Sequence, residues 1–127
     1  MDIIGIGTEI VECLRVGRMV EQHGEQFLTR VYTEREMRFC QSRRRATEQF
    51  AAYWAAKEAI LKALNTPWRE GMEWTDLEIR EEPGAGPIVE ISGATRELAQ
   101  SLQVSRVMLS MSHCRAYATA TAIAVRG

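Results

Sequence analysis

An alanine-rich segment between residues 47 and 64 limits the fold of this chain more than any other feature. At about 100° per residue in a helix, its large apolar side chains form one arc and its alanines cover most of the rest. The large side chains are those of Phe50, Trp54, Leu61 and Leu64; the alanines stand at positions 51, 52, 55, 56, 59 and 63. A helix that is apolar nearly all round is buried, so we expect the rest of the chain to be built around it.

Three charged residues in this helix need an explanation. Lys57 projects within the arc of large side chains, and we expect its stem to pack in the core while the ammonium reaches a polar edge. Glu58 and Lys62 lie one turn apart on a second face beside alanines, where little bulk blocks access to them. They form either an ordinary helix-stabilising pair, worth roughly 0.2–0.5 kcal/mol, or part of a site for a metal-bound phosphate.

Length and composition are ordinary. We expect one domain over residues 1–127, because this length suffices to bury one sizeable core. With 46% hydrophobic residues, 26% charged residues and a net charge of −1, bulk charge indicates neither nucleic acid nor a membrane as a partner. Function must therefore come from local arrangements.

Cysteine usage and the apolar pattern indicate the compartment. Cys13, Cys40 and Cys114 lack CxxC spacing, so we expect reduced, semi-buried thiols and neither a disulfide framework nor a zinc site. The N-terminus has no basic leader, and no apolar run approaches about 18 residues, so we expect neither a signal peptide nor a transmembrane helix. These features predict a cytoplasmic protein.

Periodicity and turn residues predict an α+β architecture. Gly24 suits the end of one helix, and Thr33 with Glu36 has the spacing of a capping box at the start of the next. The predicted strands cover residues 2–10, 77–82, 88–92, 106–112 and 117–125, and the predicted helices cover 11–23, 33–41, 47–64 and 94–102. We expect the isoleucine-rich first strand to be buried, and Leu14 to lie on the inner, apolar face of the first helix. The second and third strands, and the fourth and fifth, are each predicted to form a β-hairpin. This order indicates an antiparallel sheet packed against the long buried helix.

Other polar positions are individually unremarkable. Glu9 stands near a strand end after two glycines, His113 follows another strand, and Arg43–Arg45 form a basic run. Such residues are most often a solvated carboxylate, a turn histidine and a solvated surface. Two carboxylates from different elements together with basic groups are nevertheless the minimal set for a Mg²⁺ ion that binds a diphosphate.

Other catalytic motifs are missing. The chain has no GxGxxG after a strand, no GxxxxGK[ST] and no GxSxG, which excludes dinucleotide-binding, Walker-type and α/β-hydrolase interpretations. A Cys114 nucleophile activated by His113 is disfavoured, because adjacent strand residues point to opposite faces.

Three segments in order resemble the motifs of bacterial holo-acyl-carrier-protein synthases, which are 4′-phosphopantetheinyl transferases. Residues 4–12, IGIGTEIVE, resemble the family's Gly-Ile-Gly-x-Asp-Ile-x-Glu motif, and residues 54–63, WAAKEAILKA, resemble Phe-Ala-Ala-Lys-Glu-Ala-x-x-Lys-Ala. Residues 109–113, LSMSH, resemble its Ser-x-Ser/Thr-His segment. The resemblance covers nearly the whole chain and implies the 4′-phosphopantetheinyl transferase fold.

The resemblance also implies an activity. The family transfers the 4′-phosphopantetheine arm of coenzyme A to a serine of apo-acyl carrier protein and releases adenosine 3′,5′-bisphosphate. By resemblance, Glu9 and Glu58 bind Mg²⁺, with Mn²⁺ as an alternative. Lys62 contacts the diphosphate and steadies the leaving group, and Glu58 helps to deprotonate the serine, either directly or through a metal-bound water.

The same resemblance assigns binding residues. His113, Arg44 and Arg45 fall where the family binds coenzyme A, with the arginines near the 3′-phosphate. The family's carrier-docking surface corresponds to a set on the first predicted helix and just beyond it: Arg15, Arg18, Met19 and Phe27. Because the family forms homotrimers with active sites at subunit boundaries, we also expect a homotrimer.

The chain departs from the family pattern at three places. Glu9 replaces an aspartate, which moves the carboxylate by roughly 1.5 Å at a metal that demands distances of about 2.1 Å. Tyr53 stands where the family has arginine, and the turn Gly84–Pro87 has no lysine. These departures keep two alternatives open: a non-catalytic module that binds coenzyme A or a carrier, and a structural interaction protein that retains only the fold. The sequence specifies neither the carrier nor the pathway, fatty-acid or polyketide.

Overall fold

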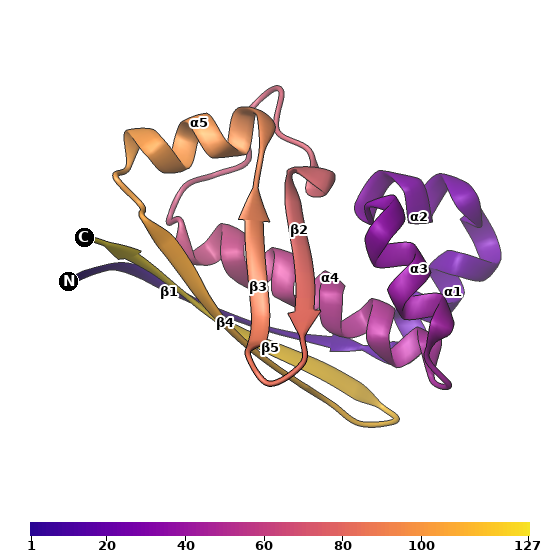
Figure 1. The fold of residues 1–127 in the computed structure, drawn as a ribbon. Helices are drawn as coiled ribbons and strands as arrows, with labels where there is room; N and C mark the ends of the chain where they lie inside the picture. Colours follow the sequence, from indigo (N-terminus) through magenta and orange to yellow (C-terminus); the bar gives the residue numbers. More distant parts are fainter.

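The computed structural model describes residues 1–127 and confirms the predicted α+β class (Figure 1). In chain order the elements are β1 (Asp2–Glu12), α1 (Cys13–His23), α2 (Glu25–Val31), α3 (Glu34–Ser42), α4 (Ala46–Ala63), the 3-10 turn η1 (Trp74–Asp76), β2 (Leu77–Glu82), β3 (Gly86–Ile91), α5 (Gly93–Ser101), β4 (Arg106–His113) and β5 (Tyr117–Arg126). None of the helices is both long enough and apolar enough to span a membrane.

Helix α4 lies across one face of a three-stranded antiparallel sheet with the strand order β1-β5-β4 (Figure 1). The contact is made largely by alanines. On β5 these are Ala118, Ala120, Ala122 and Ala124, each at most 2% exposed, and the α4 alanines from Ala51 to Ala63 are equally buried. Because alanine side chains are short, the helix and the sheet approach each other closely.

Two glycines of β1 permit the closest approach. A Cβ atom at Gly5 would collide with the carbonyl oxygen of Ala63, and one at Gly7 would collide with that of Ala59. Only glycine leaves room for the α4 backbone at these positions. This packing brings the residues that follow Gly7 on β1 beside α4.

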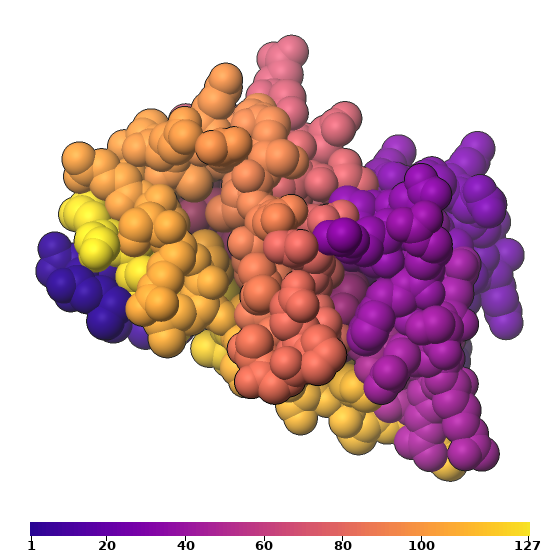
Figure 2. Space-filling model, in the orientation of Figure 1, coloured from indigo at the N-terminus to yellow at the C-terminus, as the bar shows by residue number.

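The second sheet is the hairpin β2–β3, whose turn bears Gly84 at φ +78° and Gly86 at φ +76°. Both predicted hairpins are confirmed, the other being β4–β5. Leu77 and Ile79 of β2 are each 1% exposed and join the main core. In Figure 2 the hairpin occupies the middle of the visible face, between α5 with β4 on one side and the N-terminal helices on the other.

Helix α4 was predicted at 47–64 and is found at Ala46–Ala63, with Asn65 at φ +56° just beyond it. Gly24 ends α1 at φ +52°, as predicted. Helix α2, however, was not predicted. Strand β1 also continues two residues further than predicted, because residues 11 and 12 still pair with β5.

Two expectations about burial were wrong. Strand β1 was expected to be buried, but Ile3, Ile6 and Ile10 are 60–62% exposed in the single chain. Leu14, assigned to the inner face of the first helix, is 62% exposed. The isoleucines face outward because the inner face of β1 holds the glycines that α4 requires.

The expected setting of Lys57 was also wrong, because its ammonium does not reach a polar edge. Lys57 and Glu36 are both fully buried, with Lys57 Nζ 2.7 Å from Glu36 Oε1. The ammonium also donates to the carbonyls of Val31, at 2.7 Å, and Trp74, at 3.1 Å. Burial lowers the pKa of Lys57 and raises that of Glu36, and the ion pair opposes both shifts. This pair joins α3 and α4 inside the core.

The cysteines are free thiols, as expected, but their burial differs from the expectation. Cys13 and Cys40 are fully buried, whereas Cys114 is exposed in the β4–β5 connection. Burial raises the pKa of the Cys13 and Cys40 thiols, which makes both poor nucleophiles.

Candidate active site

A pair of carboxylates lies between β1 and α4. Glu9 and Glu58 lie close enough for each carboxyl group to influence the pKa of the other. Burial and the neighbouring Glu9 carboxylate raise the pKa of Glu58, against weaker opposing effects of Arg15 and Trp54. Burial alone would raise the pKa of Glu9, but hydrogen bonds from Lys62 and Ile10, with a smaller effect of Glu58, lower it overall. Two carboxylates this close cannot both ionise readily without a neighbouring cation.

Lys62 belongs to this cluster, but not as the partner of Glu58. Its Nζ lies 3.2 Å from Glu9 Oε2 and donates to the carbonyl of Thr8 at 3.1 Å. The side chain is 54% exposed, so the ammonium remains accessible to a ligand. The helix-stabilising pair of Glu58 with Lys62 is therefore not formed, and the alternative of a simple ion pair within α4 is wrong.

Glu9 accommodates its extra methylene by folding back on its own strand. Its Oε1 accepts a hydrogen bond from the Ile10 N–H at 3.1 Å, while Oε2 faces Lys62. This conformation keeps the carboxylate close to β1. The longer side chain still lies close enough to Glu58 to influence its pKa.

The donor set fits a hard divalent cation. Nowhere in the protein do three or more histidine, cysteine, aspartate or glutamate side chains gather as a ligand cluster, so Glu9 and Glu58 are only a pair. Mg²⁺ is commonly held by one or two carboxylates, with water and substrate phosphates completing its octahedron. Burial and the negative charge of Glu9 raise the pKa of Glu58, and a bound cation would favour its ionised form.

A second polar cluster lies at the N-terminus of α4. His113 Nδ1 is 2.9 Å from Glu48 Oε1, and His113 Nε2 is 3.3 Å from Gln49 Nε2. The other oxygen of Glu48 lies 3.5 Å from Arg45 Nη1. His113 and Arg45, which the sequence analysis grouped together, thus meet at one carboxylate. Arg44 is exposed in the same α3–α4 connection.

The two clusters do not meet within one chain. Glu48 and Glu58 are ten residues apart on α4, which corresponds to about 15 Å along the helix axis. Glu9 lies on one edge strand of the sheet and His113 on the other, with β5 between them. The predicted metal ligands and Lys62, a predicted coenzyme A residue, therefore lie apart from the other predicted coenzyme A residues, Arg44, Arg45 and His113, in the single chain.

The predicted carrier-docking residues lie on α1 and α2. Arg15 and Arg18 are exposed, Met19 is half-buried, and Phe27 is 6% exposed because it packs against Trp54 and Tyr32. Arg15 is close enough to Glu58 to lower its pKa. The exposed apolar side chain here is Leu14, which the sequence analysis missed because its spacing matched the inner face.

Two positions that depart from the family pattern, Tyr53 and the turn at residues 84–87, have clear structural settings. Tyr53 points inward, with its hydroxyl donating to Glu81 Oε2 at 2.9 Å and its ring stacked on Phe39. It is 1% exposed and so offers no contact to a ligand. The turn that lacks a lysine, residues 84–87, is exposed apart from half-buried Pro87.

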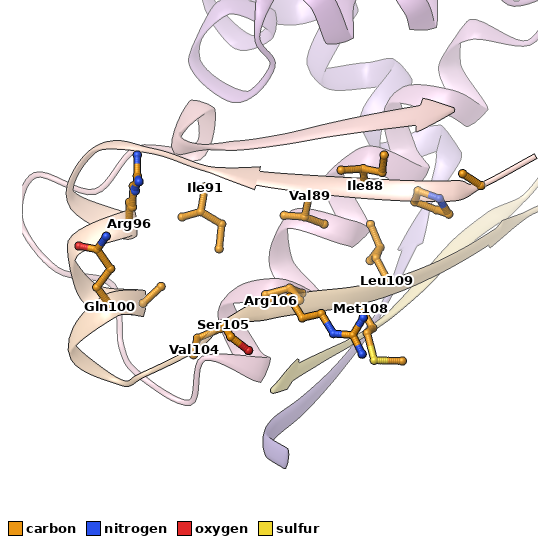
Figure 3. Close-up of a pocket in the computed structure, with 14 residues that line it drawn as sticks. Ile88, Val89, Ile91, Arg96, Gln100, Val104, Ser105, Arg106, Met108 and Leu109 are labelled. Carbon is orange, nitrogen blue, oxygen red and sulfur yellow. The ribbon is translucent and has the colours of Figure 1, made fainter. Parts of the chain in front are cut away.

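The largest pocket lies away from both clusters. It has a volume of about 680 Å³ and separates β3 and α5 from β4 (Figures 2 and 3). Arg96 and Arg106 are its only charged lining residues, among aliphatic side chains such as Val89, Ile91 and Leu109. With no carboxylate or histidine in its wall, it offers no group for acid–base or metal chemistry.

An α+β chain whose paired carboxylates and lysine suit a metal-bound diphosphate has the parts of a phosphoryl transferase. A family model described as the 4′-phosphopantetheinyl transferase superfamily matches residues 5–122. The chain belongs to this superfamily.

Individual relatives support this family membership. A holo-[acyl-carrier-protein] synthase of Rhodopirellula baltica is 45% identical over 120 residues, covering 94% of this chain and 95% of the relative. The crystal structure of the synthase from Neisseria meningitidis has a TM-score of 0.88 at 29% identity, covering 98% of this chain and 100% of that one. The synthase of Bacillus anthracis, in complex with CoA (3′,5′-ADP), has a TM-score of 0.80 at 30% identity, with 98% of each chain covered. These structures confirm the predicted fold.

Proposed function

We propose that this protein transfers the 4′-phosphopantetheine group of coenzyme A to a serine of apo-acyl carrier protein in a Mg²⁺-dependent reaction, releasing adenosine 3′,5′-bisphosphate. The observation that carries the proposal is the proximity of Glu9 and Glu58, beside Lys62, in a chain of this superfamily. We place the reaction in the cytoplasm, where a reducing environment suits the exposed thiol of Cys114.

Glu9, Glu58 and Lys62 have different roles in the proposed reaction. Glu9 and Glu58 would hold the divalent cation, which when bound neutralises the charge of the diphosphate. The serine oxygen attacks the β-phosphorus as the bond to the bridging oxygen of the α-phosphate breaks, and Lys62 stabilises the charge on that oxygen. The serine proton passes to Glu58, directly or through water.

The 3′-phosphate of coenzyme A would be bound by Arg44, Arg45 and His113 of a neighbouring protomer. Support comes from the separation of the two clusters within one chain, which a homotrimer with active sites at its subunit boundaries would bring together. An unpartnered apolar sheet face also supports assembly. The strand register places Ile6, Ile123 and Met108 side by side on that face, opposite α4.

Subunit complementation tests this arrangement. Glu58→Gln and His113→Ala protomers should each be impaired alone. If the site is shared, mixed trimers recover activity, because about one quarter of the boundaries join an intact Glu58 to an intact His113. Activity of the mixture no higher than that of the separate variants would contradict a shared site.

The acidic carrier would dock on α1, where Arg15 and Arg18 supply positive charge. Met19 and Phe27 lie at and beneath this surface, and the exposed Leu14 adds an apolar contact. Arg15 links the docking surface to the carboxylate pair through its influence on Glu58.

The direct test of the function is a mass measurement. The protein is incubated with coenzyme A, Mg²⁺ and an apo carrier, and the carrier should gain the mass of phosphopantetheine. If a folded sample modifies none of several carriers but binds coenzyme A tightly by calorimetry without Mg²⁺, the protein is a non-catalytic binding module instead.

A further inference from the structure

The Glu48 carboxylate contacts both His113 and Arg45. Its Oε1 lies 2.9 Å from His113 Nδ1 and its Oε2 lies 3.5 Å from Arg45 Nη1. The Glu48 side chain is 10% exposed, whereas those of His113 and Arg45 are 31% and 63% exposed. The carboxylate therefore lies beneath two more accessible basic groups that come from different elements.

The helix dipole alone does not account for this burial. An acidic residue in the first turn of a helix gains its small dipole benefit while fully exposed. Glu34 in α3 shows the ordinary case, because it is 81% exposed and pairs only with Arg38 of its own helix. A buried carboxylate costs solvation, which Glu48 recovers only through the two groups that it holds.

We propose that Glu48 is a positioning residue that orients His113 and Arg45 together for binding the 3′-phosphate of coenzyme A. The inference rests on the proposed function, in which these two residues bind that group. With Nδ1 held by Glu48, the His113 ring directs Nε2 away from the carboxylate. The weak 3.3 Å contact of Nε2 with the Gln49 amide is one that a phosphate oxygen would replace. Arg45 keeps guanidinium donors free on its exposed side.

Two substrates that differ only in the 3′-phosphate separate positioning from general damage to the fold. We expect the wild-type protein to prefer coenzyme A to 3′-dephospho-coenzyme A in kcat/KM. Glu48→Gln keeps the size of the side chain but removes its charge, and we expect the preference to fall about tenfold. Glu48→Asp should give an intermediate preference. The matched control Glu34→Gln also removes a first-turn acid and should leave the preference unchanged.

Each result of this experiment either supports or overturns the positioning role of Glu48. An unchanged preference in Glu48→Gln, with both substrates affected alike, overturns the proposal, and so does a wild-type protein that does not distinguish the two substrates. If a thermal melt shows that Glu48→Gln does not fold, the Glu48→Asp variant decides in the same way.

Absence of turnover in the wild-type protein would instead contradict the proposed function. Calorimetry then tests Glu48 alone, with adenosine 3′,5′-bisphosphate and adenosine 5′-monophosphate as probes. The wild type should bind the bisphosphate more tightly than the monophosphate. In Glu48→Gln the ratio of the two affinities should be about tenfold smaller. An equal preference in the two proteins overturns the proposal.

Discussion

Lys57 and Glu58 are adjacent on α4 and belong to the same motif, yet their surroundings differ. The ammonium of Lys57 is enclosed by the Glu36 carboxylate and two backbone carbonyls, with no part exposed. Glu58 is half-buried and faces Glu9, a group of its own charge. Lys57 has all its partners inside the protein, whereas Glu58 faces a like charge that Arg15 offsets only weakly.

The difference separates a structural charge from a functional one. A buried charge with a complete set of hydrogen bonds has nothing left for a ligand, so Lys57 stabilises the arrangement of α3 and α4. A carboxylate pair at a partly exposed position attracts a cation and can bind one reversibly. Variants of the two groups should therefore affect different measurements.

The largest expected effect is on stability. Lys57→Met leaves the Glu36 carboxylate buried without its ion-pair partner, and we expect the free energy of unfolding to fall by about 3–5 kcal/mol. Chemical denaturation measures this loss. The double variant Lys57→Met/Glu36→Leu should recover only part of it, because the unpaired charge is removed but the backbone N–H groups of Thr33 and Ile79 lose their acceptor. A loss below about 1 kcal/mol in the single variant would contradict a structural role.

Lys62→Ala should affect activity instead. Removing the ammonium from the developing charge of the leaving group should lower kcat by about 100-fold. Stability should change by less than about 1 kcal/mol, because the Lys62 side chain is 54% exposed. Transfer assays and thermal melts on one preparation give both values. Activity within twofold of wild type would exclude Lys62 from the chemistry.

A smaller effect concerns pH. The folded state raises the pKa of Glu58, so it binds this proton more tightly than the unfolded chain does. In metal-free protein this contribution to stability is present at low pH and is lost as pH rises above 4.5 through the raised pKa. Glu9 has a lowered pKa, so its contribution to stability is present above pH 4.5 and is lost only as pH falls below that value. Thermal melts without metal should show this fall in stability above pH 4.5 in the wild type and not in Glu58→Gln. Equal dependence of the melting temperature on pH in the two proteins would contradict the prediction.

Local patterns predicted much of the fold. The extent of α4 and both hairpins follow from periodicity and turn residues, which act over a few positions. Helix α2 was missed because it has only seven residues and little periodicity. The outward isoleucines of β1 were missed because α4 requires glycine on the inner face, a tertiary constraint that apolar pattern does not reveal.

The candidate site was predicted less completely. The motifs identified Glu9, Glu58 and Lys62, and the structure brings these three together. The partners of Lys57 and His113 were not predicted, because Glu36 and Glu48 lie 21 and 65 positions away in the chain. Such pairs depend on how elements pack, and sequence spacing carries no signal of it. The functional roles of all these residues stay predictions.

The most direct test of the central claim compares wild type with Glu58→Gln in transfer of phosphopantetheine from coenzyme A to an apo carrier, with Mg²⁺ varied. We predict that the variant folds with an unchanged melting temperature in metal-free buffer near pH 4.5, and that its kcat/KM falls by at least about 100-fold at every Mg²⁺ concentration. Transfer by the folded variant at a rate near that of wild type would contradict the account.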